Sequence, residues 1–99
     1  MISKIHYLKT LPEFFRDVQD GRKTFEIRKD DRDYNVGDYL LLREWDPTIQ
    51  KGCHPYLPER NFTGKEVQVK IKYILRDYPE FGLMPGYAIL SIELGFWFN

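Results

Sequence analysis

The sequence has little cysteine, no net charge and no long apolar run, and each of these absences excludes a class of protein. The one cysteine, Cys53, cannot form an internal disulfide, which agrees with a reducing compartment. Fifteen basic residues balance fifteen acidic ones, so no global positive field can collect nucleic acid at long range. Any site for a polyanion therefore has to be local.

Membrane proteins and metalloproteins are two further classes that the sequence argues against. No apolar run approaches the roughly 20 residues that a membrane helix needs, and residues 1–6 lack the apolar centre of a signal peptide. We therefore expect a cytoplasmic protein without membrane contact. Only His6 and His54 could join Cys53 as soft ligands, too few for the tetrahedral ligand set of a structural zinc site. We expect neither a metal nor another cofactor.

One helix is predicted close to the N-terminus. An alternating segment, residues 5–8, predicts a short first strand that ends at Lys9. Residues 10–13 match a capping box, in which the side chains of Thr10 and Glu13 would each accept a hydrogen bond from the other's backbone N–H. Gly21 would end the helix in a left-handed conformation. Helical spacing places four apolar residues on the face turned to the core: Leu11, Phe14, Phe15 and Val18.

A charge-rich strand is predicted at residues 24–28. Alternation puts Phe25 and Ile27 on one face, which we expect to be turned to the core, and the polar residues of the strand on the other. The following run, residues 29–33, carries charges of both signs, which is typical of a solvated loop.

Residues 39–45 form a long β-prone segment, but the alternation does not show which of its two faces would be turned to the core. Either Leu40 and Leu42 point inward with Glu44 in line, or the odd-numbered residues do. An inward carboxylate would have to emerge at a rim or cleft unless it is paired. Residues 46–62 contain three prolines and no clear period, so a long loop is predicted there.

The last third of the chain predicts two strands and an aromatic tail. Residues 65–75 alternate most clearly, with apolar side chains at odd positions, and residues 87–94 form the final strand. The tail, residues 95–98, would plug the end of the core, which favours a monomer, or form a dimer contact. The inner face of the final strand is expected to hold Ala88, Leu90, Ile92 and Leu94.

These elements predict one domain over residues 1–99, since 42% hydrophobic content suits a single core in a chain of this length. Five strands around one helix predict an α+β, mainly β fold. Its architecture would be a small, largely antiparallel barrel or half-barrel of about five to six strands with one N-terminal helix.

Three motifs together resemble the ASCH domain, a small β-barrel superfamily related to PUA RNA-binding domains. They are Gly21-x-Lys23-x-x-Glu26-x-Arg28, Val36-Gly37-Asp38 and Leu40-x-Leu42. Further segments resemble a short bacterial and phage branch of that superfamily, known only as a domain of unknown function. These segments are His6-x-Leu8-Lys9, Glu26-Ile27-Arg28 running into Asp31-Arg32, Glu44-Trp45-Asp46, Thr63-Gly64-Lys65 and Gly86 to Ile92.

The resemblance implies a barrel whose cleft is lined by the Gly-x-Lys-x-x-Glu-x-Arg segment, with RNA or a nucleotide-like small ligand as the partner. Some ASCH proteins are small amidohydrolases acting on an acetylated cytidine nucleoside, and their proposed nucleophile is a threonine three residues after the motif lysine. Here that position holds Glu26, and Thr24 lies at a different spacing. A carboxylate cannot replace a hydroxyl that a lysine activates for acyl attack, so binding is favoured over hydrolysis.

The candidate residues support several hypotheses. In a binding module, cations would contact phosphate, a carboxylate would accept from a base amino group, and an aromatic ring would stack on a base. In an enzyme, Lys23, Glu26 and Glu44 would supply the general acid and base. Alternatively, ion pairs among Lys23, Glu26 and Arg28 only hold the barrel mouth together, or the chain is a non-catalytic protein-interaction domain. The expected ligand-binding residues are His6, Lys9, Lys23, Glu26, Arg28, Arg32, Glu44 and Trp45, with Tyr34 as a second candidate for stacking.

Overall fold

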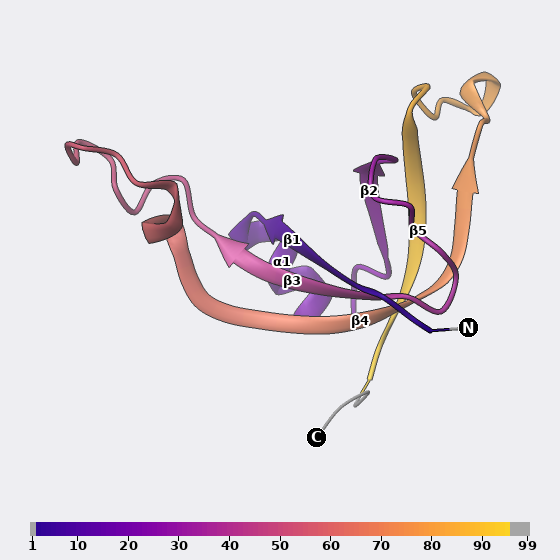
Figure 1. The fold of residues 1–99 in the computed structure, drawn as a ribbon, viewed down its shortest axis with the longest axis horizontal. Helices are drawn as coiled ribbons and strands as arrows, with labels where there is room; N and C mark the ends of the chain where they lie inside the picture. The colour runs from indigo at the N-terminus through magenta and orange to yellow at the C-terminus, as the bar shows by residue number, and fades with distance from the viewer. Residues whose placement is uncertain (1, 96–99) are drawn as a thin grey trace.

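A computed structural model describes residues 2–95 and confirms a mainly β fold with one α-helix. The five strands form a single curled sheet, an open half-barrel, in the order β1-β3-β4-β5-β2 (Figure 1). β1 pairs with β3 in parallel, and every other neighbouring pair is antiparallel. In chain order the elements are β1 (Ile5–Thr10), α1 (Pro12–Gln19), β2 (Phe25–Lys29), β3 (Tyr39–Trp45), the 3-10 helix η1 (Pro58–Asn61), β4 (Phe62–Arg76), the 3-10 helix η2 (Pro79–Phe81) and β5 (Tyr87–Leu94).

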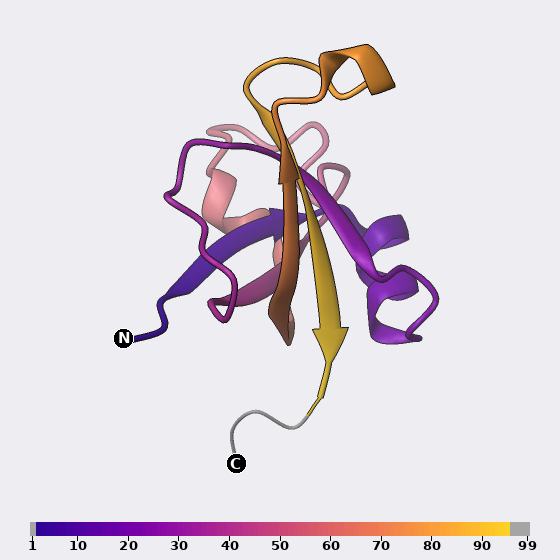
Figure 2. The ribbon, with the colours of Figure 1, turned by 90° about the vertical axis from the view of Figure 1, so that its right-hand side faces the viewer.

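The 15-residue strand β4 curls the sheet. Its first part pairs with β3 and its second with β5, so that the β1–β3 part and the β5–β2 part run in different directions (Figures 1 and 2). The pairing with β5 shifts register between Ile71 and Tyr73, which marks a bulge. Because the bulge adds one residue, Ile74 packs against the core instead of Tyr73 or Leu75. The predicted odd-numbered inner face is therefore wrong beyond Ile71.

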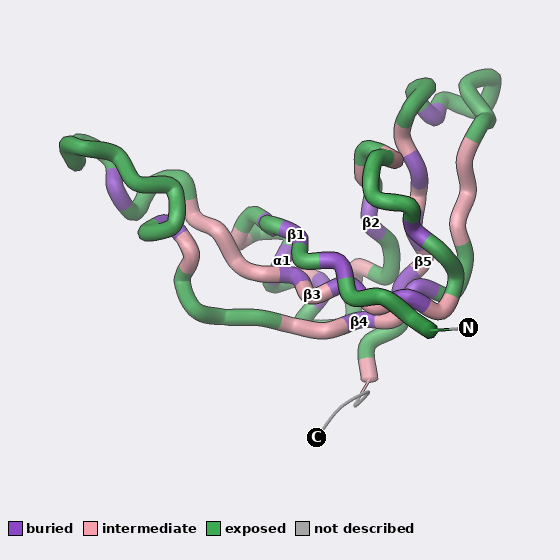
Figure 3. The backbone as a smooth tube through the Cα atoms, in the orientation of Figure 1, coloured by how far each residue is buried: buried purple, intermediate pink, exposed green. Residues whose placement is uncertain are grey.

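The core lies on the inner side of the curled sheet, under α1 (Figure 3). Alternation left open which side of residues 39–45 faces the core. It is the even-numbered side, because Leu40 and Leu42 are completely buried. On β5 three of the four predicted inner residues are buried, whereas Leu94 is exposed and lines a small pocket beside Val18 and Gly21. The core cluster consists of Leu8, Phe15, Val18, Tyr34, Leu40, Leu42, Val69, Ile71, Ala88, Leu90 and Ile92.

Helix α1 forms where predicted but begins without the predicted capping box. Leu11 is the N-cap and no side-chain bond caps it. Thr10 is instead the last residue of β1, which continues past Lys9, and its hydroxyl accepts a hydrogen bond from Arg28. The expected apolar face is also split: Phe15 and Val18 are buried, whereas the other two residues, Leu11 and Phe14, are exposed.

The turn after α1 depends on Gly21, which has a φ of 79° as predicted for a left-handed helix stop. A Cβ at this position would have no other atom within 4 Å, so an alanine there would cause no steric clash. Its cost would come only from holding a residue with a side chain in the left-handed backbone conformation. Gly21→Ala should therefore lower the free energy of unfolding by about 1 kcal/mol. Urea unfolding would measure this loss against Gln19→Ala, an exposed position on α1. Equal stability of the two variants would contradict it.

Strand β2 carries the most consequential correction. Phe25 and Ile27, expected in the core, are 43% and 55% exposed, whereas Glu26 is 3% exposed. The register explains this, since Glu26 lies opposite Leu90 and Arg28 opposite Ala88, two inner residues of β5. The prediction failed because it assigned the core side by hydrophobicity alone, and here the inward carboxylate is neutralised by its neighbours.

The long connection between β3 and β4 is fixed by hydrogen bonds. The predicted loop after β3 contains η1 and is held around the fully buried Asn61. The side chain of Asn61 accepts a hydrogen bond from Gln50 Nε2 at 2.8 Å and donates one to the Asp46 carbonyl at 2.6 Å.

The aromatic side chains of the predicted tail, from Phe96 on, lie outside the described residues. Among residues 2–95, no helix has the length and apolarity to cross a membrane.

Candidate functional site

Three charged side chains of the Gly-x-Lys-x-x-Glu-x-Arg segment meet at the inner side of β2. Glu26 accepts from Lys23 Nζ at 2.5 Å through Oε2, and from Arg28 Nε at 2.9 Å and Nη2 at 2.8 Å through Oε1. The side chain of Glu26 is only 4% exposed, against 16% for Lys23 and 23% for Arg28. This triad, Lys23–Glu26–Arg28, therefore carries a formal charge of +1, and its cations are the parts that reach water.

Arginine side chains connect the two edge strands of the half-barrel. Arg28, on edge strand β2, donates through Nη1 to the Lys9 carbonyl and through Nη2 to the Thr10 hydroxyl, both at 3.1 Å, on edge strand β1. Arg32 donates to the Tyr7 carbonyl of the same strand at 2.9 Å. Side-chain hydrogen bonds, rather than a ladder of backbone hydrogen bonds, thus join β1 to β2 and to the loop that follows β2.

A pocket of about 400 Å³ opens between β2 and the end of β1 with the start of α1. The ammonium group of Lys23 lies 5.5 Å from the ring centroid of Phe14 and 4.9 Å from that of Phe25. The pocket therefore combines a cationic wall with two exposed aromatic rings. It is lined by Lys9, Thr10, Leu11, Phe14, Lys23, Phe25, Glu26, Ile27 and Arg28.

Of the eight predicted ligand-binding residues, four line this pocket: Lys9, Lys23, Glu26 and Arg28. Sequence reasoning missed Phe14 and Phe25, because it assigned both to the core. For Phe25 alone the motif offered a signal, since a strand with Glu26 turned inward necessarily turns its odd-numbered residues outward.

The other predicted residues lie elsewhere. Glu44 accepts from the Thr63 hydroxyl at 2.8 Å and does not line the pocket, so the structure does not bring it to Glu26. Trp45 donates through Nε1 to the Pro58 carbonyl at 3.2 Å, and Lys9 Nζ lies 4.3 Å from its ring centroid. Trp45 therefore borders the pocket only through Lys9.

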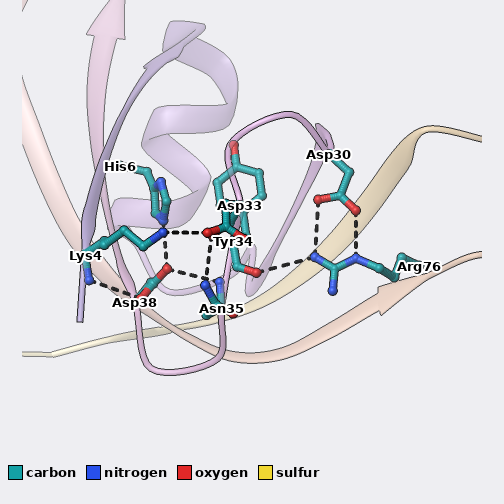
Figure 4. A network of polar contacts seen from close by, with 8 residues as sticks. All are labelled: Lys4, His6, Asp30, Asp33, Tyr34, Asn35, Asp38 and Arg76. Carbon is teal, nitrogen blue, oxygen red and sulfur yellow. Dashed lines mark hydrogen bonds and ion pairs between the residues drawn. The ribbon is translucent and has the colours of Figure 1, made fainter. Parts of the chain in front are cut away.

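His6 belongs to a separate buried cluster (Figure 4). Its Nε2 donates to Asp38 Oδ2 at 2.8 Å, and its ring meets the ring of Tyr34 edge-on at a centroid distance of 4.8 Å. Asp38 also accepts from the backbone N–H groups of Lys4, at 3.1 Å, and Asn35, at 3.0 Å. Both His6 and Tyr34 are thus committed to fastening the turn before β3, and Tyr34 offers no exposed ring for stacking.

Burial and hydrogen bonding act in opposite directions on the Asp38 carboxyl. Burial favours the neutral acid, but the hydrogen bonds from His6 and from the backbone of Lys4 and Asn35 outweigh it and hold the pKa of Asp38 below its ordinary value. Burial raises the pKa of Tyr34. At the other end of the same loop Arg76 Nε donates to Asp30 at 2.7 Å, and this bond raises the pKa of Arg76 (Figure 4). The loop from β2 to β3 is therefore held at both ends.

Comparison with known proteins places these features in a family. Residues 5–92, which include the triad and all residues lining the pocket, match the model of a family described as a domain of unknown function, DUF3850. A protein of Escherichia phage P2, described as an uncharacterized 12.9 kDa protein in the GpA 3' region, is 37% identical over 97 residues, covering 96% of this chain and 73% of the phage protein. The chain therefore belongs to the DUF3850 family.

Proposed function

We propose that this domain is an ASCH-like, PUA-related module that binds RNA or a nucleotide, with one base and its phosphate held in the pocket of the triad. The observation that carries the proposal is the pairing of a net positive triad with two exposed phenylalanine rings around one hollow. The pocket, at about 400 Å³, falls in the size range of small-molecule sites.

Phosphate would be bound by the two cations of the triad. Lys23 uses two of its three N–H donors, on the carbonyl of Phe25 and on Glu26. Arg28 uses four of its five, on Glu26, Thr10 and the Lys9 carbonyl. Each cation thus keeps one donor for a ligand, and the carboxylate between them fixes where that donor points.

The base would stack on the rings of Phe14 and Phe25. Both rings are exposed on the pocket wall, and sequence-tolerant stacking on aromatic side chains is the usual way in which proteins hold unpaired bases. A hollow of this kind suits a single-stranded or flipped-out base better than a duplex groove. The neutral net charge of the chain agrees with local rather than long-range attraction.

Binding is favoured over amide hydrolysis by the state of the two carboxylates. Both oxygens of Glu26 accept charge-assisted hydrogen bonds from cations, which stabilises the ion and opposes its use as a nucleophile or general acid. Glu44, the second carboxylate of the enzymatic hypothesis, does not line the pocket. Incubation with acetylated cytidine tests the alternative directly: turnover lost in Lys23→Ala would favour hydrolysis.

Removal of Lys23 should weaken RNA binding. Fluorescence anisotropy with short single-stranded RNA at two salt concentrations should show lower affinity for Lys23→Ala and a salt slope smaller by about 1, because one phosphate contact is lost. Phe14→Ala should lose about 1–3 kcal/mol of binding free energy per stacked base.

The matched controls are Lys51→Ala and Tyr56→Ala, two exposed positions of the loop after β3 that do not line the pocket. Both should bind as the wild type does. Circular dichroism verifies that each variant is folded. If wild type and Lys23→Ala bind equally, or if binding is insensitive to salt, the proposal is wrong.

A further inference from the structure

The outer side of the β2–β5–β4 part of the sheet is apolar, although an antiparallel sheet facing water normally carries polar residues there. Ile89 lies directly opposite Ile27 on one side and Leu75 on the other. In the next row Ser91 lies between Phe25 and Tyr73. These two cross-strand rows contain no charged residue.

The connection between β4 and β5 extends this apolar surface beyond the strands. Figure 1 shows β2, β5 and the end of β4 side by side, with the η2 connection at their upper end. Phe81 is 79% exposed there and stacks on Tyr78 at a centroid distance of 5.5 Å, and Met84 is 64% exposed. A second pocket, of about 430 Å³, lies beside Phe81. It is lined by Ile27, Leu75, Phe81, Gly82, Leu83, Met84, Tyr87 and Ile89.

We propose that this surface, the outer apolar face, is the interface of a two-fold symmetric dimer of the chain. An isologous interface uses one patch on both copies, so the patch has to be complementary to itself. The outer apolar face meets that requirement, because it holds both a protruding ring, Phe81, and an apolar hollow next to it. In a pair related by a two-fold axis, each ring can enter the hollow of the other copy.

The available area supports a second copy as the occupant. Six large side chains of the face have exposed fractions from 42% to 79%: Phe25, Ile27, Tyr73, Tyr78, Phe81 and Met84. At about 200 Å² for each large side chain, they present roughly 600–700 Å². A standard stable interface buries about 800 Å² per partner, which the rim residues of the face can complete.

Charge also favours a second copy over a partner of another class. Neither of the two rows holds a cation that could bind nucleic acid, with Lys29 opposite Tyr87 only at their border, and the equal numbers of basic and acidic residues give two copies no net repulsion. The interface adjoins the proposed RNA site, because Phe25 and Ile27 belong to the outer apolar face and also line the pocket of the triad. Of the residues that line the second pocket, only Ile27 also lines the pocket of the triad.

Sedimentation velocity over a range of protein concentrations tests the proposal. The wild type should dimerise, and Phe81→Glu should weaken the dimer at least tenfold, because it places a charge in an apolar interface. Tyr56→Glu, which puts the same charge on an exposed aromatic position outside the face, should dimerise as the wild type does. Met84→Glu repeats the test at a second exposed position if Phe81→Glu does not fold.

A wild type that stays monomeric at every concentration would overturn the proposal, as would a Phe81→Glu or Met84→Glu variant that dimerises normally. Association that persists in these variants and is abolished by Tyr56→Glu would also overturn it. Phe81→Glu should bind RNA at least as well as the wild type, because Phe81 does not line the pocket of the triad, so failure of the dimer and failure of the RNA site are read separately.

Discussion

Glu26→Gln should lower the free energy of unfolding by about 3 kcal/mol, since removal of one partner from a buried ion pair leaves the other charges uncompensated. The glutamine would leave Lys23 and Arg28 facing each other at the inner side of β2, and its amide can accept at only one atom. For a domain of this size the melting temperature should fall by roughly 12–24 °C. Urea unfolding and calorimetry would both measure the loss.

The matched control is Glu80→Gln, which makes the same change at an exposed residue of η2 and should leave stability nearly unchanged. Lys23→Ala should cost less than Glu26→Gln, because Arg28 still neutralises the buried carboxylate. If Glu26→Gln is as stable as Glu80→Gln, the triad does not hold the two sides of the pocket together, and the geometry proposed for phosphate binding loses its basis.

Asp38→Asn should cost about 2–3 kcal/mol at neutral pH. The carboxylate receives hydrogen bonds from His6 and from the backbone N–H groups of Lys4 and Asn35, and it is almost fully buried. An asparagine amide would turn its NH₂ group toward one of these donors, which leaves a buried donor unsatisfied. Chemical unfolding at pH 7 should show the difference from the wild type.

The effect of Asp38→Asn should depend on pH in a defined direction. The pKa of Asp38 is lower in the folded protein than its ordinary value of 3.8, so the carboxylate binds protons more readily when the chain is unfolded. Its contribution is therefore complete above that value and is lost as pH falls through the folded pKa. The stability difference between wild type and Asp38→Asn should shrink over that acidic range.

Asp31→Asn provides the control, because Asp31 is an exposed residue of the same loop. Its stability should follow that of the wild type at every pH. A difference between Asp38→Asn and wild type that stays constant from pH 7 down to strongly acidic solution would show that the carboxylate charge does not fasten the turn before β3.

The sequence predicted most elements of the fold but assigned one strand to the wrong face. Alternation identified β1, β2, β3, β4 and β5, because these patterns depend on local spacing, but it left open whether the side of β3 with Leu40 and Leu42 or the other side would be buried. It could not show that the hydrophobic side of β2 would face outward. That outcome depends on β5, which places Glu26 opposite Leu90, and such long-range pairing leaves no local trace.

The candidate site shows the same division. The motif identified Lys23, Glu26 and Arg28 as residues that act together. Alternation along β2 explains why Glu26 and Arg28 share a face, whereas Lys23 lies before the strand and reaches Glu26 with its side chain. Neither the bulge in β4 nor the exposure of Phe14 follows from spacing, since both depend on how the sheet curls. The ring of Phe14 was therefore assigned to the core although it lines the pocket.

The guanidinium groups of Arg28 and Arg32, bound to the Lys9 and Tyr7 carbonyls, have a consequence for assembly. An edge strand with unused carbonyls is a template on which a strand of another molecule can add, and repeated addition produces fibres. Here two carbonyls of β1, those of Tyr7 and Lys9, are occupied by cations, and Lys23 Nζ likewise occupies the Phe25 carbonyl of β2. Growth from either edge is thereby opposed, so association through a sheet face would close after two copies.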